Sequence, residues 1–192
     1  MSDNLQSARW VAGTGLGVAL AVTLPAVFHQ IGLGPVFLPM HLPIVLAGAL
    51  SGPRAGLLAG GLAPAVSHLA TGMPPVSPPV APLMTVELAI YGLVAGLARH
   101  ALTGRAAGTA AGALLREYLW LIVAMISGRA ALAVAAVVLG PALGLKVPAL
   151  VYVKGALLAG LPGLALQLAI IPVLVSRLQP ALRHAPTRSG QS

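Results

Sequence analysis

Six apolar stretches, separated by short polar or proline-rich segments, make up most of this chain. They cover residues 10–31, 38–50, 55–70, 80–98, 114–139 and 149–175. A helix needs about 20 mostly apolar residues to cross a lipid bilayer. The pattern therefore predicts an all-α membrane protein, a bundle of about six transmembrane helices.

Proline, glycine and charge mark the boundaries between these stretches. The sequence SGPR at residues 51–54 combines turn-forming residues with a positive charge, and residues 71–79 read TGMPPVSPP. Proline at this density ends a helix, because it lacks the N–H group and its ring clashes with the preceding turn. We expect one transmembrane domain at residues 9–178, after a cytoplasmic segment at residues 1–8. A basic cytoplasmic tail with a disordered end is expected at residues 179–192.

Composition supports a lipid environment. Of 192 residues, 58% are hydrophobic and 7% are charged, whereas a soluble domain has about 25% charged residues. Too few polar side chains are present to cover a water-soluble core. A formal net charge of +8 in a soluble protein would suggest a nucleic-acid partner, but these arginines stand singly at the ends of apolar stretches. We therefore expect contact with membrane lipid and none with nucleic acid.

The arginines also predict the orientation in the membrane. With six spans both termini share one side, and that side receives Arg9, Arg54, Arg99, Arg105, Arg116, Arg177, Arg183 and Arg188. The opposite loops hold Lys146 and no other Lys or Arg. Because positively charged loops stay in the cytoplasm, we expect a multi-pass cell-membrane protein with cytoplasmic termini and an outward-facing Pro-rich loop.

Three ionisable residues lie inside the predicted spans, namely Glu87, Arg129 and Lys154. Each costs about 2.5–3.5 kcal/mol on insertion, so each needs a partner or a function. At a rise of about 1.5 Å per residue, all three fall in the outer part of their spans. His41 and His68 lie at the same outer level. We expect these residues to gather where an extracellular ligand arrives.

These charges admit two interpretations. Glu87 and Lys154 either pair only with each other to permit insertion, or two cations and one acid leave a surplus that a ligand carboxylate or similar anion balances. In the second case Lys154 or Arg129 holds the anion, and Glu87 pairs with the remaining cation. Tyr91, Tyr152 and Gln167 are candidates for hydrogen bonds, either to the ligand or, more commonly for such residues, between helices. No metal site is expected, because zinc needs three or four ligands and the chain has no Cys.

Small residues form a stripe on the first predicted helix. Gly13, Gly17 and Ala21 recur every four residues, a pattern that lets helix backbones approach closely in lipid. The stripe faces either the rest of the bundle or a separate membrane subunit. Near the inner end of the fifth span, Tyr118 and Trp120 are expected to anchor the helix at the membrane interface.

Catalytic motifs are missing from the sequence. It contains no HExxH, no GxSxG and no P-loop, and its only aspartate, Asp3, lies in the N-terminal segment. Glu87 has no second acid within reach on its helix. We therefore expect a protein that is not an enzyme and has no cofactor of its own.

The order of the motifs resembles the substrate-binding (S) components of energy-coupling factor (ECF) transporters, which are bacterial vitamin importers. The matching segments are LPMHLPIVLAG at 38–48, GPRAG at 52–56, TGMPP at 71–75, ELAIYG at 87–92, AMISGR at 124–129, and LPG at 161–163 followed by Gln167. The resemblance covers residues 9–178.

The resemblance implies six helices, a vitamin bound from outside, and docking on a transmembrane coupling subunit. Two cytoplasmic ATPases, which use the ATP, drive that subunit. The resemblance implies that Gly13, Gly17 and Ala21 contact the coupling subunit. It also implies a ligand held by the outer loops and the outer halves of the later helices. The candidate substrate-binding residues are therefore His41, His68, Met73, Glu87, Tyr91, Arg129, Lys154 and Gln167.

Two functions of other classes fit the same residues. A small secondary carrier acting alone would couple Glu87 to protons. A scaffold subunit of a membrane assembly would need no pocket at all. Neighbouring genes that encode two ATPases and a coupling subunit would favour the ECF function over both of these. The sequence does not name the vitamin.

Overall fold

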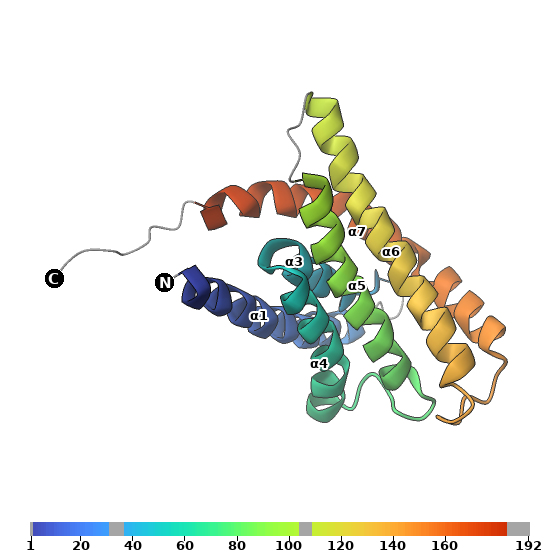
Figure 1. Cartoon of the computed structure of the whole chain (residues 1–192). Coiled ribbons are helices and arrows are strands. Elements are labelled where there is room, and N and C mark those ends of the chain that lie inside the picture. The colour runs from blue at the N-terminus through green and yellow to red at the C-terminus, as the bar shows by residue number, and fades with distance from the viewer. Residues whose placement is uncertain (1, 31–36, 104–108, 184–192) are drawn as a thin grey trace.

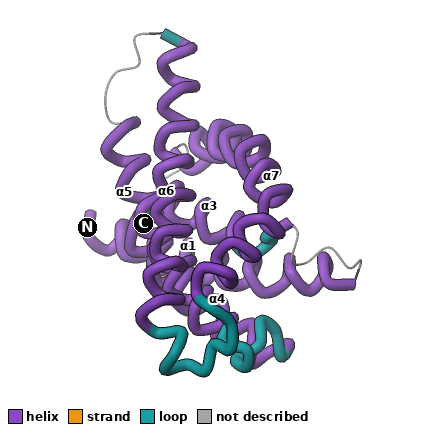
Figure 2. The backbone as a smooth tube through the Cα atoms, turned by 90° about the vertical axis from the view of Figure 1, so that its right-hand side faces the viewer, coloured by secondary structure: helices purple, strands orange, loops and turns teal. Residues whose placement is uncertain are grey.

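The apolar stretches form helices whose ends lie close to the predicted turns. The computed structural model describes residues 2–30, 37–103 and 109–183. In chain order the helices are α1 (Ser2–Gln30), α3 (His41–Ser51), α4 (Pro53–Thr71), α5 (Val80–Thr103), α6 (Ala110–Val138) and α7 (Ala149–Arg183). The described residues contain helices and loops but no strand, as Figure 2 shows. The prediction of an all-α bundle of about six helices is confirmed.

Four described helices are long and apolar enough to cross a bilayer. The qualifying stretches are Ser7–Phe28, Val80–Leu102, Ala110–Val138 and Ala149–Gln179. α3 has 11 residues, which is about 16 Å of helix, whereas the bilayer core is about 30 Å thick.

Gly52 alone separates α3 from α4, and its φ of 101° lies in the region that favours glycine. α3 and α4 therefore adjoin each other at a single turn residue.

α4 and α5 pack backbone against backbone at glycines. A side-chain carbon at Gly56 would collide with the carbonyl group of Gly92, and one at Gly60 would collide with the carbonyl group of Leu88. Glycine permits such a close approach in lipid, where packing and not water expulsion holds helices together. α1 and α3 pack against this pair of helices (Figure 1).

The small-residue stripe of α1 faces α3 and α4 of the same chain. A side-chain carbon at Gly17 would lie 3.0 Å from the Cβ of Ala47 on α3 and 3.2 Å from the Cβ of Ala59 on α4. Ala21 is fully buried, and Gly13 meets the end of α3. In this structure Gly17 and Ala21 are therefore buried within the chain and Gly13 is partly buried, whereas contact of the stripe with a coupling subunit stays a prediction. The exposed large apolar residues of α1 are Val11, Leu16, Leu20 and Val27.

α7 is the longest described helix and changes direction along its length. Figure 1 shows its first part (orange) beside α6 and its last part (red) turning away. Pro162 and Pro172 lie inside it, and a proline inside a helix removes a hydrogen bond and bends the axis. Gln179, which was predicted to lie in a tail, belongs to this helix. Likewise α1 begins at Ser2, inside the expected N-terminal segment, whereas residues 184–192 lie outside the described part.

Trp120 is fully buried and lies in the core of the bundle. It packs in one cluster with Tyr91 on α5, Leu121 on α6 and Ile171 on α7. The prediction that Trp120 anchors the helix at the membrane interface is therefore wrong. Tyr118, two residues earlier on the same helix, is partly buried.

Candidate functional site

A cavity of about 390 Å³ lies at one end of the bundle. Its walls come from the last part of α1, the start of α3, the end of α4, the start of α5, and the facing parts of α6 and α7. The loop after α4 completes the wall. All these segments lie at the end of the bundle opposite the helix ends that carry arginines. A volume in this range suits a small-molecule site.

Most of the cavity wall is apolar. Three of the five methionines of the chain contribute to it, namely Met40, Met73 and Met84. The polar or ionisable lining residues are His41, Ser67, Thr71, Glu87, Arg129 and Tyr152. A largely apolar wall with a few polar groups at one place is the usual composition of a ligand pocket.

Glu87 is the centre of the buried polar group in this wall. Nη1 of Arg129 on α6 lies 2.7 Å from Glu87 Oε1, and Nε2 of His41 on α3 lies 3.4 Å from the same oxygen. The side chains of Glu87 and His41 are 3% and 2% exposed. A buried carboxylate is stable only when it is paired and hydrogen-bonded. Three helices thus bring their polar side chains together at one oxygen atom.

Several nitrogen atoms in this group have no hydrogen-bond partner among the described residues. They are Nδ1 of His41 and Nε and Nη2 of Arg129. Most buried polar groups in proteins are hydrogen-bonded, and leaving a donor unpaired costs about 1–3 kcal/mol. The group therefore has hydrogen-bonding capacity that a bound molecule can use.

Tyr91 and Gln167 form a helix-to-helix contact behind His41. The Tyr91 hydroxyl donates a hydrogen bond of 2.9 Å to Gln167 Oε1, and both residues are buried outside the cavity wall. The rings of Tyr91 and His41 meet edge to face with centroids 5.5 Å apart. Of the two roles that the sequence allowed, the structure shows the contact between helices.

His68 and Met73 meet the Pro-rich loop in different ways. Nδ1 of His68 donates a hydrogen bond of 2.9 Å to the carbonyl oxygen of Pro74. Pro74 and Met73 line the cavity, whereas His68 does not. His68 thus supports the loop from outside the cavity, and Met73 contributes its side chain directly.

Lys154 lies on a different face of α7 from the cavity. Tyr152, Ala156 and Ala159 line the cavity at helical spacing, whereas Lys154 is exposed and is not part of the wall. Residues two apart on a helix point about 200° away from each other, so Tyr152 and Lys154 face opposite sides. The Glu87–Lys154 pair considered from the sequence is therefore not formed, and Arg129 takes the place of Lys154.

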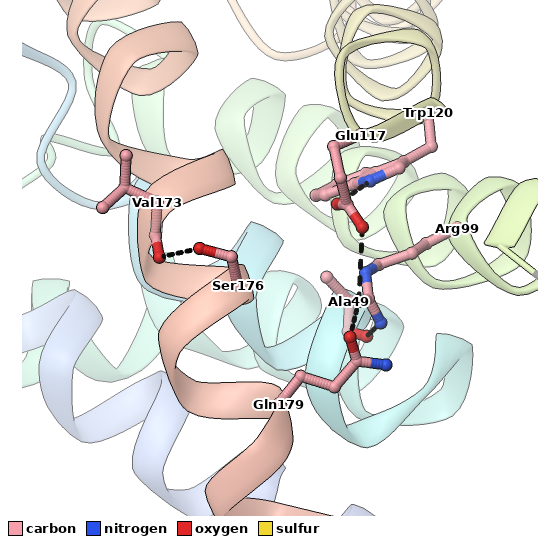
Figure 3. Close-up of polar contacts among 7 residues, drawn as sticks. All are labelled: Ala49, Arg99, Glu117, Trp120, Val173, Ser176 and Gln179. Carbon is pink, nitrogen blue, oxygen red and sulfur yellow. Dashed lines mark hydrogen bonds and ion pairs between the residues drawn. The ribbon is translucent and has the colours of Figure 1, made fainter. Parts of the chain in front are cut away.

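A second buried polar group lies at the other end of the bundle and joins four helices, as Figure 3 shows. Arg99 on α5 donates hydrogen bonds to the carbonyl oxygen of Ala49 on α3 (3.0 Å) and to Gln179 Oε1 on α7 (2.8 Å). Its Nη2 atom is 3.6 Å from Oε1 of Glu117 on α6. Trp120 Nε1 donates to Glu117 Oε2 at 2.6 Å. Arg99, which follows the predicted apolar stretch at residues 80–98, instead lies buried inside α5.

The family is decided by one comparison. A family model described as "ECF transporter, substrate-specific component" matches residues 10–175. The chain belongs to this family. It is a family of transport proteins and not an enzyme family. Comparisons with curated proteins and with solved structures found no match.

Of the polar lining residues of this ECF component, two were not considered from the sequence, and Tyr152 was considered but not placed among the substrate-binding residues. Ser67 and Thr71 lie at the end of α4, and Tyr152 lies on α7. The spacing of Tyr152, Ala156 and Ala159 is the sequence signal for one shared helix face. Ser67 and Thr71 also share a face by their spacing of four. Such spacing places residues together, but it does not tell which face looks into a cavity.

Proposed function

We propose that this chain captures a vitamin-like small molecule from outside the cell and delivers it to a transmembrane coupling subunit driven by two ATPase subunits. The observation that carries the proposal is the cavity of about 390 Å³ with the buried Glu87–Arg129–His41 group, in a member of the ECF substrate-specific family. In this proposal ATP is used by the partner subunits, and the chain needs no cofactor of its own.

The charge distribution supports entry of the substrate from the outside of the cell membrane. The cavity lies at the end of the bundle where α1, α4 and α6 finish and α3, α5 and α7 begin. The opposite end carries Arg9, Arg54, Arg99, Arg116 and Arg177. Because arginine-rich ends stay in the cytoplasm, the cavity faces outward and the termini lie inside.

Retention of a small molecule by the purified chain tests this proposal. Ala156 lines the cavity from α7, so Ala156→Phe places a ring in the space that the substrate needs. Ala165 is exposed on the same helix and is not part of the wall, so Ala165→Phe is the matched control. We predict that mass spectrometry after gentle purification finds one molecule retained by the native chain and the control and lost from Ala156→Phe.

Two results would contradict the proposal. One is a native chain that retains no molecule when purified from cells grown in rich medium. The other is equal retention by Ala156→Phe and the native chain, with both proteins folded as judged by their thermal unfolding.

A further inference from the structure

The two charges that face the cavity cancel each other. Glu87 and Arg129 form an ion pair of 2.7 Å, and His41 is the only other residue of the described wall that can be charged near them. Lys154, the second cation in the sequence-based count, is exposed and lies outside the wall. A charged ligand group would therefore bring a charge that has no counter-charge, and burying an unpaired charge is costly. The site suits an uncharged polar group.

Glu87 also decides which nitrogen of His41 carries the proton. A carboxylate accepts hydrogen bonds only, so Nε2 of His41 donates toward Glu87 Oε1. In the uncharged ring the other nitrogen, Nδ1, is then an acceptor. Nδ1 has no partner among the described residues, and the His41 side chain is 2% exposed. This wall therefore offers one buried acceptor.

Arg129 offers donors next to that acceptor. Its Nη1 atom is used by Glu87, whereas Nε and Nη2 have no partner in the described part of the chain. A side-chain carbon at residue 160 would lie 3.1 Å from Nη2 and 2.9 Å from Leu38 Cδ1, so Gly160 lets Arg129 and Leu38 pack close to the backbone of α7. Arg129 and His41 contact the same oxygen of Glu87. The unused donors and the unused acceptor thus belong to neighbouring side chains.

We propose that the cavity takes an uncharged molecule with a carbonyl oxygen next to an N–H group, as in an amide or a lactam, on an otherwise apolar body. The carbonyl oxygen accepts from Arg129, and the N–H group donates to Nδ1 of His41. This inference rests on the proposed function, because it assumes that the cavity is the substrate site. It replaces the anionic ligand expected from the sequence, since that expectation counted Lys154 as part of the site.

The apolar body packs on flexible side chains. Met40, Met73 and Met84 line the cavity, and no Trp or Phe does so among the described residues. Thioether side chains adapt to irregular shapes, whereas aromatic rings select flat molecules by stacking. Tyr152 and His41 are the only aromatic rings of the described wall, so most of the apolar body packs on side chains that adapt to its shape.

Matched probes on the full chain in lipid nanodiscs test the polar end. The probes are 4-cyclohexylbutanamide, its N,N-dimethyl amide and 4-cyclohexylbutanoate, which share one apolar body. By isothermal titration calorimetry, with empty nanodiscs subtracted, we expect the primary amide to bind roughly ten- to a hundredfold more tightly than the carboxylate. The dimethyl amide, which has no N–H group, falls between them.

Variants assign the preference to named residues. In Glu87→Gln/Arg129→Met, which keeps the wall uncharged, the advantage of the primary amide over the carboxylate is expected to disappear. His41→Phe keeps a ring but removes the acceptor, so the two amides bind it equally. Lys154→Met, on the exposed face, behaves as the native chain does. Because His41→Phe leaves the ion pair intact, it tests the inference even where the double variant folds poorly.

The outcomes separate this inference from the proposed function. Tighter or equal binding of the carboxylate by the native chain would overturn the inference, as would binding of neither amide at millimolar concentration. A retained molecule that is an ionised acid at this end would overturn it and leave the proposed function standing. An amide preference in a chain that takes up the molecule without partner subunits would support this inference and contradict the proposed function.

Discussion

Glu87 is held by two side chains from two other helices, and the ion pair with Arg129 is the shorter contact, at 2.7 Å against 3.4 Å for His41. The Arg129 side chain is 14% exposed and that of Glu87 is 3% exposed, so neither charge is well solvated. Removing one member of a buried pair leaves the other charge uncompensated. Replacing both members by uncharged groups of similar size avoids that cost.

Arg129→Met is therefore predicted to lower the free energy of unfolding by about 3–5 kcal/mol. Glu87→Gln/Arg129→Met is expected to recover most of that loss, and Lys154→Met to change little because Lys154 is exposed. Thermal unfolding of the purified proteins in one detergent measures all three. A double variant as unstable as Arg129→Met would show that the ion pair is not what stabilises this part of the wall.

The residues that carry charge were easier to find in the sequence than their partners. Glu87 and Arg129 stand out because ionisable residues inside apolar stretches are costly. Which residue pairs with Glu87 depends on how each helix is rotated about its axis. The faces toward lipid and toward the core are both apolar, so hydropathy does not define that rotation for α6 or α7. This is why Lys154 was expected in the site and Trp120 at the membrane interface.

At the scale of helices, packing of α1 depends on which glycines face α3 and α4. Gly17 faces Ala47 and Ala59, whereas a side chain at Gly15 would meet no atom within 4 Å. The two positions are on the same helix and have the same native residue. They therefore form a matched pair for testing whether the stripe is internal packing.

We predict that Gly17→Leu lowers the free energy of unfolding by about 1–3 kcal/mol or more, because overpacking forces the helices apart. Gly15→Leu is expected to be nearly neutral. The fluorescence of Trp10 and Trp120 during heating of the purified variants follows the unfolding. Equal melting temperatures for Gly17→Leu and Gly15→Leu would place the stripe outside the bundle, where a separate subunit contacts it.

The helices themselves were largely predictable, and their ends were less so. Turns at Gly52 and after Thr71 follow from glycine and proline, which disfavour a continuing helix. The continuation of α5 past Arg99 was not predicted, because an arginine after an apolar stretch usually begins a loop. Its burial depends on Glu117 and Gln179, which lie on other helices. Contacts between residues so far apart in the chain leave no local pattern.

In the whole molecule, the two buried polar groups lie at opposite ends of the bundle. The Glu87 group lines the cavity, and the Arg99 group joins α3, α5, α6 and α7 at the other end. The arginine-rich end is the one that faces the cytoplasm under the positive-inside rule. Under the proposed function, substrate would enter at the cavity end and the partner subunits would act at the arginine-rich end.

ATP-dependent uptake of the retained molecule is the measurement that bears most directly on this function. Cells that produce the chain with its coupling subunit and both ATPases are expected to accumulate the molecule identified by mass spectrometry. Replacing the ATP-binding lysine of the ATPases should stop accumulation while the chain still retains the molecule, and Ala156→Phe should abolish both. Accumulation that is unchanged when the coupling subunit is left out would contradict the function proposed here.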